Sequence, residues 1–341
     1  MFKNTLRYAA LLCAAALSFL FVACGGDNPD AGDQGDFTPV TIQHAFGETV
    51  IDKKPERVVT LYFGNQDIVL ALGVVPVGFS MANFGITEVD KGMLPWTRQR
   101  LAELGEKNPN VFNDLAGTDM EAVAACEPDL ILAPYSAMPQ EEYDTLSLIC
   151  PVVPYPEGGA WAIQWKEWIR VTAKALGMAE KGESVIAETD ALIQAKGAEH
   201  PEIAGKKIVW ANFRANNLST VGTYTPSDTR GTFLLTLGMD YPQGYYDLWT
   251  DRTKYNLSLS SEHADVMNGA DAVIGYGDDA TWDAVKAHAV WGQTNPIKNG
   301  AIAAMGNGGY LAASGTATPL SIEYTIDAYL NLIGDALAHN A

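Results

Sequence analysis

Short apolar runs alternate with amphipathic segments along most of this chain. The runs with the length and composition of buried strands lie at 57–63, 76–80, 127–132, 151–155, 205–213 and 272–276. Segments between and after them, such as 64–74 and 321–337, carry apolar residues at helical spacing. Because strands that alternate with helices form βαβ units, the pattern predicts an α/β protein with mainly parallel sheets.

One long helical segment separates two stretches of this alternation. Residues 165–196 have a helical pattern with one break at Gly177, and a new strand follows. A folded body of about 300 residues is more than a single hydrophobic core usually supports. The sequence therefore predicts an N-terminal α/β lobe over 38–178, an interlobe helix over 179–200 and a C-terminal α/β lobe over 201–341.

The first residues differ in composition from this body. Lys3 and Arg7 precede an apolar run too short for a membrane span of roughly 20 residues, which is typical of a secretory signal over 1–23. The residues before Cys24 resemble a bacterial lipobox, so we expect Cys24 to be lipidated; ordinary cleavage and an uncleaved anchor are the alternatives. The Gly/Asp-rich segment 24–37 predicts a flexible tether that holds the lobes at the outer face of a membrane.

The net charge limits the partners that the protein can bind, and the positions of the cysteines limit the disulfides that it can form. The formal net charge of −19 repels nucleic-acid phosphates, so we expect no nucleic-acid partner, and we expect a monomer. Cys126 and Cys150 each precede a predicted strand, and neighbouring parallel strands would place both at one end of a sheet. A disulfide between them is geometrically possible in an exported protein, and two buried thiols are the alternative.

Seven segments in a fixed order carry a resemblance to a known family. They are PERVVTL (55–61), DIVLALGVVPVG (67–78), DMEAVAACEPDLIL (119–132), LICPVVPY (148–155), TFLLTLGM (232–239), LSSEHADVMNGADAVI (259–274) and PIKNGAIAAM (296–305). Together they resemble the substrate-binding lipoproteins of bacterial ABC importers for iron–siderophores, haem or vitamin B12. The resemblance implies two Rossmann-like lobes bridged by a rigid helix, a ligand held between them, no intrinsic cofactor and no enzymatic activity. The paired Trp161 and Trp165 are most similar to the iron–siderophore branch, which implies a ferric siderophore as the ligand.

The two predicted lobes repeat one local arrangement. Glu121 and Glu262 each lie early in a short helix that leads into an apolar strand. In the family that the chain resembles, one acidic residue per lobe meets arginines of a permease powered by a separate ATPase, and motif position maps this role onto both glutamates. A carboxylate is favourable near a helix start, so simple capping is the alternative.

Cationic and aromatic side chains suit a bulky, usually anionic complex whose iron is already enclosed by oxygen ligands. Ligands of open α/β sheets bind beyond the carboxyl ends of the strands, where we expect Tyr62, Tyr135 and Arg214. The resemblance also implies an arginine or other polar residue near Arg214. The candidate ligand-binding residues are Tyr62, Trp96, Arg98, Tyr135, Trp161, Arg214, Arg230, Trp249 and Arg252, with core packing or surface solvation as the alternative for each.

Other functions match the residues less well. A bare-metal carrier would need several inward-facing ligands, but the five histidines are scattered without ligand spacing, so we expect no metal site. Haem would need an axial His or Tyr, and because tyrosines are plentiful a haem or cobalamin carrier stays an alternative. No nucleophile elbow, zinc motif or pair of catalytic carboxylates points to an enzyme. A surface scaffold lipoprotein is the alternative from a different class.

Overall fold

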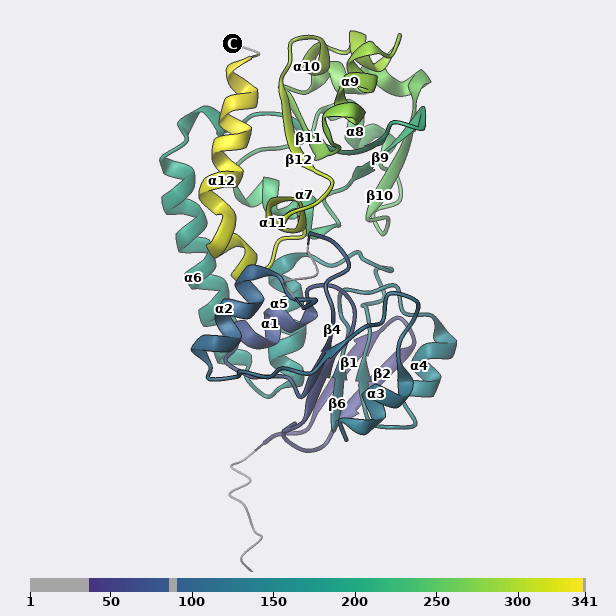
Figure 1. Ribbon diagram of the computed structural model, residues 1–341, viewed down its shortest axis with the longest axis vertical. Helices are drawn as coiled ribbons and strands as arrows, with labels where there is room; N and C mark the ends of the chain where they lie inside the picture. The colour runs from purple at the N-terminus through teal and green to yellow at the C-terminus, as the bar shows by residue number, and fades with distance from the viewer. Residues whose placement is uncertain (1–36, 86–90, 340–341) are drawn as a thin grey trace, which may run out of the picture. The chain divides into compact units, whose positions relative to one another are not determined.

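Two five-stranded sheets form the framework of the described residues, 37–85 and 91–339, in a computed structural model (Figure 1). We call the part built on the first sheet the N-terminal lobe and the part built on the second sheet the C-terminal lobe. The predicted fold class, two α/β lobes joined by a long helix, is confirmed. The signal over 1–23, the lipidation site Cys24 and nearly all of the tether lie outside the described residues.

The N-terminal lobe contains an entirely parallel sheet in the order β5-β4-β3-β6-β7. Its strands are β3 (Val58–Thr60), β4 (Gly78–Ser80), β5 (Val111–Phe112), β6 (Leu130–Leu132) and β7 (Val152–Val153). The helices are α1 (Asn65–Ala71), α2 (Pro95–Glu103), α3 (Met120–Ala125) and α4 (Gln140–Leu146). Strands β3, β4 and β6 are buried at every position, as expected for parallel strands covered on both faces. A separate antiparallel hairpin, β1 (Val40–His44) and β2 (Gly47–Ile51), precedes them.

The C-terminal sheet is mixed rather than wholly parallel, in the order β10-β9-β8-β11-β12. Its strands are β8 (Ile208–Arg214), β9 (Asn217–Tyr224), β10 (Asn256–Ser260), β11 (Ala272–Tyr276) and β12 (Ile302–Gly306). Strands β8, β11 and β12 run parallel, whereas β9 is antiparallel to both of its neighbours. The α-helices are α7 (Thr229–Thr236), α8 (Gln243–Leu248), α9 (Asp279–Ala287), α10 (Asn295–Lys298) and α11 (Tyr310–Ala313), and the 3₁₀ helices are η2 (Pro201–Ile203), η3 (Ser261–Gly269) and η4 (Trp291–Gln293).

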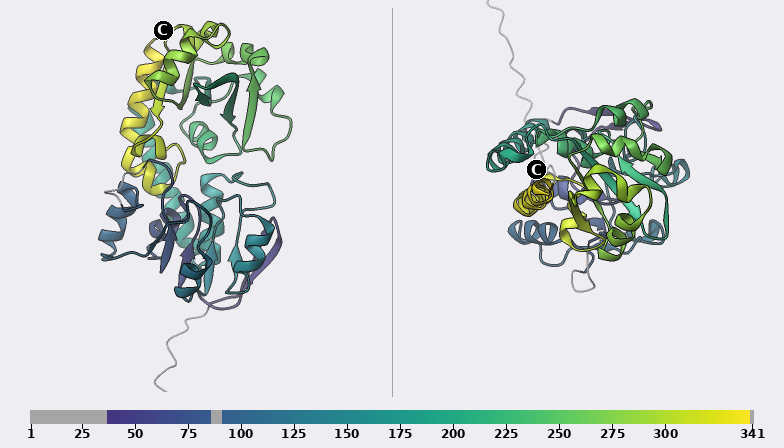
Figure 2. Two further views of the ribbon diagram at one scale, coloured as in Figure 1. Left: turned by 45° about the vertical axis from the view of Figure 1, so that its right-hand side comes forward. Right: turned by 90° about the horizontal axis from the view of Figure 1, so that it is seen from above.

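Helices that pack along both lobes connect them. Helix α5 (Trp165–Ala175) packs against α6 (Ala179–Ala198), and α12 (Pro319–Ala338) packs against α6. Figure 1 shows α6 and α12 side by side, and the view from above in Figure 2 also shows them as neighbours. Helix α12 follows the C-terminal sheet in the chain, yet it also contacts α1 and α2 of the N-terminal lobe. The lobes are therefore held together by more than the predicted interlobe helix.

The start of α12 explains how it enters the N-terminal lobe. Thr318 and Ser321 form a reciprocal capping box, and Pro319 occupies the first turn, where no amide donor is needed. The Thr318 hydroxyl also donates to the buried carboxylate of Asp67, at 3.1 Å, next to the start of α1. This cap fixes the helix start against the first lobe.

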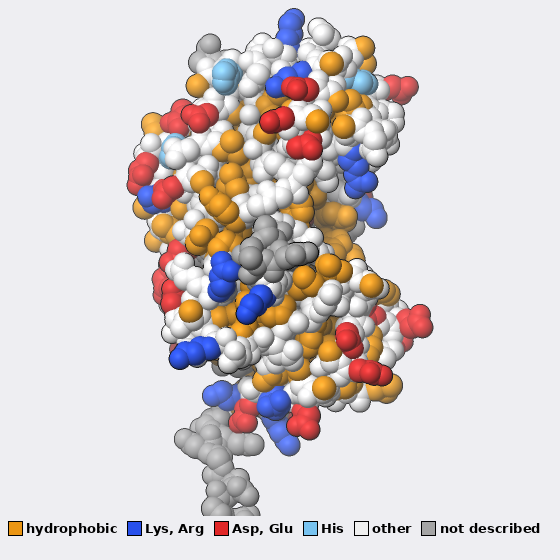
Figure 3. Space-filling model, in the orientation of Figure 1, with side chains coloured by type: hydrophobic (Ala, Val, Ile, Leu, Met, Phe, Trp, Pro, Cys, Tyr) orange, Lys and Arg blue, Asp and Glu red, His pale blue; other side chains and the backbone are white. Residues whose placement is uncertain are grey.

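The surface of the described body is charged on both lobes. Figure 3 shows acidic side chains spread over both lobes on one face, and a hollow between the lobes in which hydrophobic side chains are visible. Within residues 37–85 and 91–339, no helix has the length and apolar character needed to cross a membrane.

Candidate functional site

A cavity of about 430 Å³ lies between the two lobes. Its N-terminal wall is formed by Phe63, Asn83, Phe84, Tyr135 and Trp161, and its C-terminal wall by Asn212, Tyr224, Arg230, Tyr255, Tyr276, Asn307 and Thr316. Several of these residues lie at or just beyond the carboxyl ends of strands, including Phe63 after β3 and Tyr276 at the end of β11. Both sheets therefore point their strand ends at one space, which is the usual ligand position of open α/β sheets.

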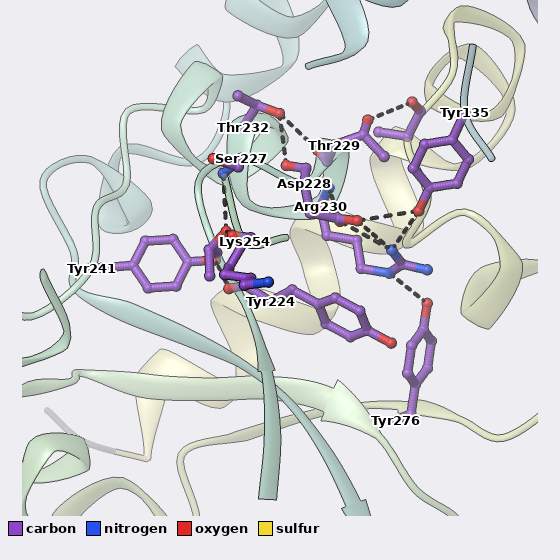
Figure 4. A network of polar contacts seen from close by, with 12 residues as sticks. Tyr135, Tyr224, Ser227, Asp228, Thr229, Arg230, Thr232, Tyr241, Lys254 and Tyr276 are labelled. Atoms are coloured by element: carbon purple, nitrogen blue, oxygen red, sulfur yellow. Dashed lines mark hydrogen bonds and ion pairs between the residues drawn. The ribbon is translucent and has the colours of Figure 1, made fainter. Parts of the chain in front are cut away.

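Arg230 is the one charged side chain among the described residues of this wall, and it is the centre of a hydrogen-bond network (Figure 4). Its Nη1 donates to both carboxylate oxygens of Asp228, at 3.0 and 2.9 Å, and to the Tyr135 hydroxyl at 2.9 Å. Its Nε donates to the Tyr276 hydroxyl at 3.1 Å, and the guanidinium carbon lies 4.1 Å from the centre of the Tyr224 ring. The Tyr135 hydroxyl in turn donates to Asp228 at 3.1 Å, so the network links the two lobes.

Local sequence explains why these two charged residues meet. Asp228 is the N-cap of α7, and its carboxylate accepts the backbone N–H of Arg230 at 2.8 Å. That cap places Arg230 in the first turn, with its side chain beside the same carboxylate. Asp228 is fully buried, whereas 12% of the Arg230 side chain is exposed. The cation reaches the cavity, and the anion lies behind it.

Burial and pairing set the charges of this network. Burial raises the pKa of Asp228 above its ordinary value, although the guanidinium and the hydrogen bonds from Arg230 and Tyr135 lower it. Burial alone lowers the pKa of Arg230, but Asp228 and the surrounding tyrosines raise it well above its ordinary value. Burial also raises the pKa of the Tyr135 phenol well above its ordinary value, so this hydroxyl is a neutral donor. The guanidinium is therefore a permanent cation in the cavity wall.

Aromatic rings cover much of the N-terminal wall. The ring centres of Tyr135 and Trp161 are 4.8 Å apart, and Tyr135 also stacks on Trp168 at 4.9 Å. Trp161 has a positive φ of 60°, and so does Tyr62 at 66°, a backbone conformation that is unfavourable for large side chains. The centres of the Tyr62 and Trp161 rings are 5.9 Å apart. Strained residues that the surrounding structure holds in place are common at ligand sites.

Of the predicted ligand-binding residues, the structure brings Tyr135, Trp161 and Arg230 together in the cavity wall. Tyr62 does not line the cavity; its ring lies against Trp161 and its hydroxyl donates to Glu142 at 2.8 Å. Arg214 is exposed at the end of β8 and lines an adjoining polar groove of about 270 Å³. These two residues flank the site rather than form its wall.

Trp96 and Arg98 were expected near the ligand, but neither lines the interlobe cavity. Trp96 is 3% exposed, and its Nε1 donates at 2.7 Å to Asp67, because α2 turns this face toward α1 and α12. It borders a separate, larger hollow of about 620 Å³ between α2, α6 and α12. That hollow is lined by charged side chains of both signs and lies away from the strand ends, so we assign the site to the interlobe cavity.

Trp249 and Arg252 form a stack of their own outside the cavity wall. The Arg252 guanidinium carbon lies 4.2 Å from the centre of the Trp249 ring, and Trp249 Nε1 donates to the carbonyl of Lys254 at 3.2 Å. Neither residue lines the cavity, because the indole of Trp249 folds back onto the backbone of the following loop.

The sequence interpretation missed part of the wall. It did not include the wall residues Asn83, Phe84, Asn212, Tyr276, Asn307 and Thr316, or Asp228, which lies behind Arg230. Tyr276 and Asn212 could have been found, because each lies near the carboxyl end of a predicted strand. Asp228 gave a weaker signal, an Asp two residues before an Arg at a helix start.

The predicted docking glutamates lie in matching places on the two lobes. Glu121 is exposed in the first turn of α3, and Glu262 is exposed in the first turn of η3. Asp119, rather than Glu121, caps α3 by accepting the Ala122 backbone N–H at 3.0 Å. Neither glutamate has a hydrogen-bond or ion-pair partner among the described residues. Both carboxylates are thus available at the surface.

The possible disulfide between Cys126 and Cys150 is absent, and both thiols are free. The Cys126 sulfur lies beside Val77 and Asn110, which precede β4 and β5. Cys150 precedes β7 at the opposite edge of the same sheet. Strands β3 and β6 separate the two thiols, so they cannot bond.

Comparisons with known proteins agree with this geometry. The sequence model of the periplasmic binding protein family matches residues 58–307. The crystal structure of Streptococcus pneumoniae TIGR4 PiaA in complex with ferrichrome is 44% identical, with a TM-score of 0.83, over 88% of this chain and 99% of that one. The probable siderophore-binding lipoprotein YfiY of Bacillus subtilis strain 168 is 27% identical over 69% of this chain and 67% of its own length. The ferric-anguibactin-binding protein FatB of Vibrio anguillarum is 28% identical, over 45% of this chain and 43% of its length.

Proposed function

Because this chain belongs to the periplasmic binding protein family, we propose that it captures a ferric siderophore between its lobes and delivers it to the permease of an ABC importer. The observation that carries the proposal is the interlobe cavity, in which rings from both lobes surround one guanidinium. Its volume falls within the roughly 300–1,000 Å³ of small-molecule sites. The names of the relatives support the same ligand class.

The wall suits a complex whose iron is already enclosed by its own oxygen ligands. Indole and phenol rings provide flat apolar contacts, and the guanidinium Nη2, which donates to no described residue, is available to donate to ligand oxygens. Iron is the cargo, so the protein contacts the organic shell rather than the metal. A hydroxamate siderophore is supported by the PiaA structure, which contains ferrichrome.

Location and anchoring belong to the same proposal. We infer that residues 1–23 direct export, that Cys24 carries the lipid, and that the monomeric protein acts on the outer side of the membrane. The lipobox-like sequence supports this inference, and a lipoprotein among the relatives agrees with it.

Docking uses one carboxylate on each lobe. Glu121 and Glu262 are exposed and unpaired within the described part of the chain, which supports contacts with cationic side chains of the permease. A ligand that draws the lobes together would also alter the spacing of these two anchors.

The binding proposal is tested with a matched pair of tryptophan variants. Trp161→Ala removes a ring from the cavity, whereas Trp249→Ala removes one that stacks on Arg252 outside it. We expect Trp161→Ala to weaken ferrichrome binding at least about tenfold, the equivalent of about 1.4 kcal/mol. The dissociation constant of Trp249→Ala for ferrichrome should stay within about twofold of that of the parent protein. Isothermal titration calorimetry at equal folded fraction gives both values.

Titrations with haemin and cobalamin test the ligand class. Saturable haem binding with a shifted absorption band, tighter than ferrichrome binding, would contradict the siderophore assignment. Absence of binding to ferrichrome, haemin and cobalamin alike would favour a scaffold lipoprotein instead.

A further inference from the structure

The positive charge in the cavity wall is balanced by a carboxylate directly behind it. Arg230 is the charged residue among the described residues of the wall, and its partner Asp228 lies 2.9 Å away, fully buried. Two other carboxylates near the strand ends of the N-terminal lobe accept hydrogen bonds from other side chains and do not line the cavity. Asp114 accepts the Ser80 hydroxyl, and Glu142 accepts the hydroxyls of Tyr62 and Thr118.

Asp228 is built into its position by several independent contacts. Its carboxylate accepts a backbone N–H, the Arg230 guanidinium and the Tyr135 hydroxyl. These donors and the adjacent guanidinium stabilise the anionic form of the carboxylate against burial, which favours the protonated form. Because the two opposite charges are only 2.9 Å apart, they act on a bound molecule as a dipole without net charge.

We propose that Asp228 is a specificity-determining residue: by neutralising Arg230, it makes the cavity prefer ferric complexes of no net charge over polyanionic ones. This inference rests on the proposed function. Ferric iron bound by three hydroxamates is electrically neutral. A complex with three catecholates, or a trihydroxamate complex with three additional carboxylates, has three negative charges. A polyanion would meet the weaker field of this dipole instead of a full positive charge, whereas the guanidinium would still hydrogen-bond a neutral oxygen shell.

The choice of probes separates charge from iron chemistry. Ferrichrome is an uncharged trihydroxamate, and ferrichrome A has the same iron-binding core with three side-chain carboxylates. The parent protein should bind ferrichrome more tightly. Asp228→Asn should move the ratio of the two dissociation constants toward ferrichrome A by at least about tenfold. Its ferrichrome A affinity should also fall more steeply with added NaCl, because an unpaired cation now faces the anion.

The chain offers a matched control for the substitution. Asp278 caps α9 by accepting the Thr281 backbone N–H, as Asp228 caps α7, but it is exposed and does not line the cavity. Asp278→Asn should leave the ratio of dissociation constants unchanged. Circular dichroism melting checks that each variant folds, and Asp228→Ser, another good N-cap without charge, replaces Asp228→Asn if that variant does not fold.

Each outcome bears on a different claim. A ratio that stays within about twofold of the parent, or that moves toward ferrichrome, would overturn the role of Asp228 while saturable ferrichrome binding upholds the carrier function. Failure of the parent protein to bind either complex would remove the proposed function and this inference together.

Discussion

At the scale of single residues, Asp67 is a buried carboxylate that forms no ion pair with any residue of 37–85 or 91–339. It accepts hydrogen bonds from Trp96 at 2.7 Å, Thr97 at 2.7 Å, Thr318 at 3.1 Å and Gln66 at 3.3 Å. Burial raises its pKa to about 6, although all four hydrogen bonds lower it. Its neighbours come from α1, α2 and the start of α12, so one carboxylate ties three helices together.

The raised pKa predicts a specific dependence of stability on pH. The folded protein holds the Asp67 proton more tightly than the unfolded chain, so this contribution is complete below pH about 4 and is lost as pH rises through about 6. A shift of about two units corresponds to about 3 kcal/mol. In Asp67→Asn this titration is absent. Between pH 4 and 7 the free energy of unfolding of the parent should fall, and that of Asp67→Asn should fall less. The difference between the two decreases should reach up to about 3 kcal/mol.

Urea denaturation at several pH values measures this difference. The amide also rearranges the local hydrogen bonds, but that offset does not vary with pH. Parallel stability curves for the two proteins would show that Asp67 does not titrate in this range.

At the scale of secondary-structure elements, close packing of α5 on α6 depends on a glycine. A Cβ atom at Gly182 of α6 would lie 2.6 Å from the Cβ of Ala173 on α5, too close for either helix to remain in place. Gly197, near the end of α6, has open space around the same position. The two glycines therefore differ in packing while belonging to one helix.

This contrast predicts opposite effects of the same substitution. Gly182→Ala should lower the free energy of unfolding by about 1–3 kcal/mol, because the helices must move apart. Gly197→Ala should be neutral or stabilising by up to about 1 kcal/mol, since alanine is the better helix former. Thermal or chemical denaturation measures both. Equal losses at the two positions would contradict the packing argument.

The elements differ in how well the sequence predicted them. The buried runs of the N-terminal sheet were recognisable because a parallel strand is apolar on both faces. Strand β9 was not, because only two of its eight residues are buried and it is rich in Asn, Ser and Thr. In the site, the strand-end rule located Tyr135, whereas Trp96 and Trp249 could not be placed because composition does not reveal which neighbour an indole faces. Burial of Asp228 behind Arg230 depends on tertiary contacts that no local pattern contains.

At the scale of the whole molecule, the surfaces that we propose for ligand capture and for delivery are different. The cavity lies between the lobes, and the proposed docking residues Glu121 and Glu262 are on exposed helix starts, one on each lobe. Tyr135 of the N-terminal lobe bonds Asp228 and Arg230 of the C-terminal lobe, so the lobes are already joined across the cavity. With helices packed along both lobes, only small movements between them are expected.

Separate surfaces predict that delivery can be abolished without loss of capture. Glu121→Lys combined with Glu262→Lys should abolish uptake of radioactive ferrichrome by cells, because the new cations repel the permease, and should leave ferrichrome affinity within about twofold. Lysine at Glu141 and Asp283, which are also exposed and lie on different lobes, is the control and should preserve uptake. An equal fall in affinity and uptake would show that the glutamates belong to the binding site.

The position of α12 has a consequence for the order in which the chain can fold. Its first turn is capped beside Asp67, and its sides pack on α1 and α2, so the N-terminal lobe takes part of its interior from the last residues of the polypeptide. While synthesis is still under way, that lobe exposes an unfilled apolar seam, and it cannot reach its final stability until residues 319–338 have emerged. The two halves are therefore not autonomous folding units, and a chain severed between them would regain structure only by reassembly of both fragments.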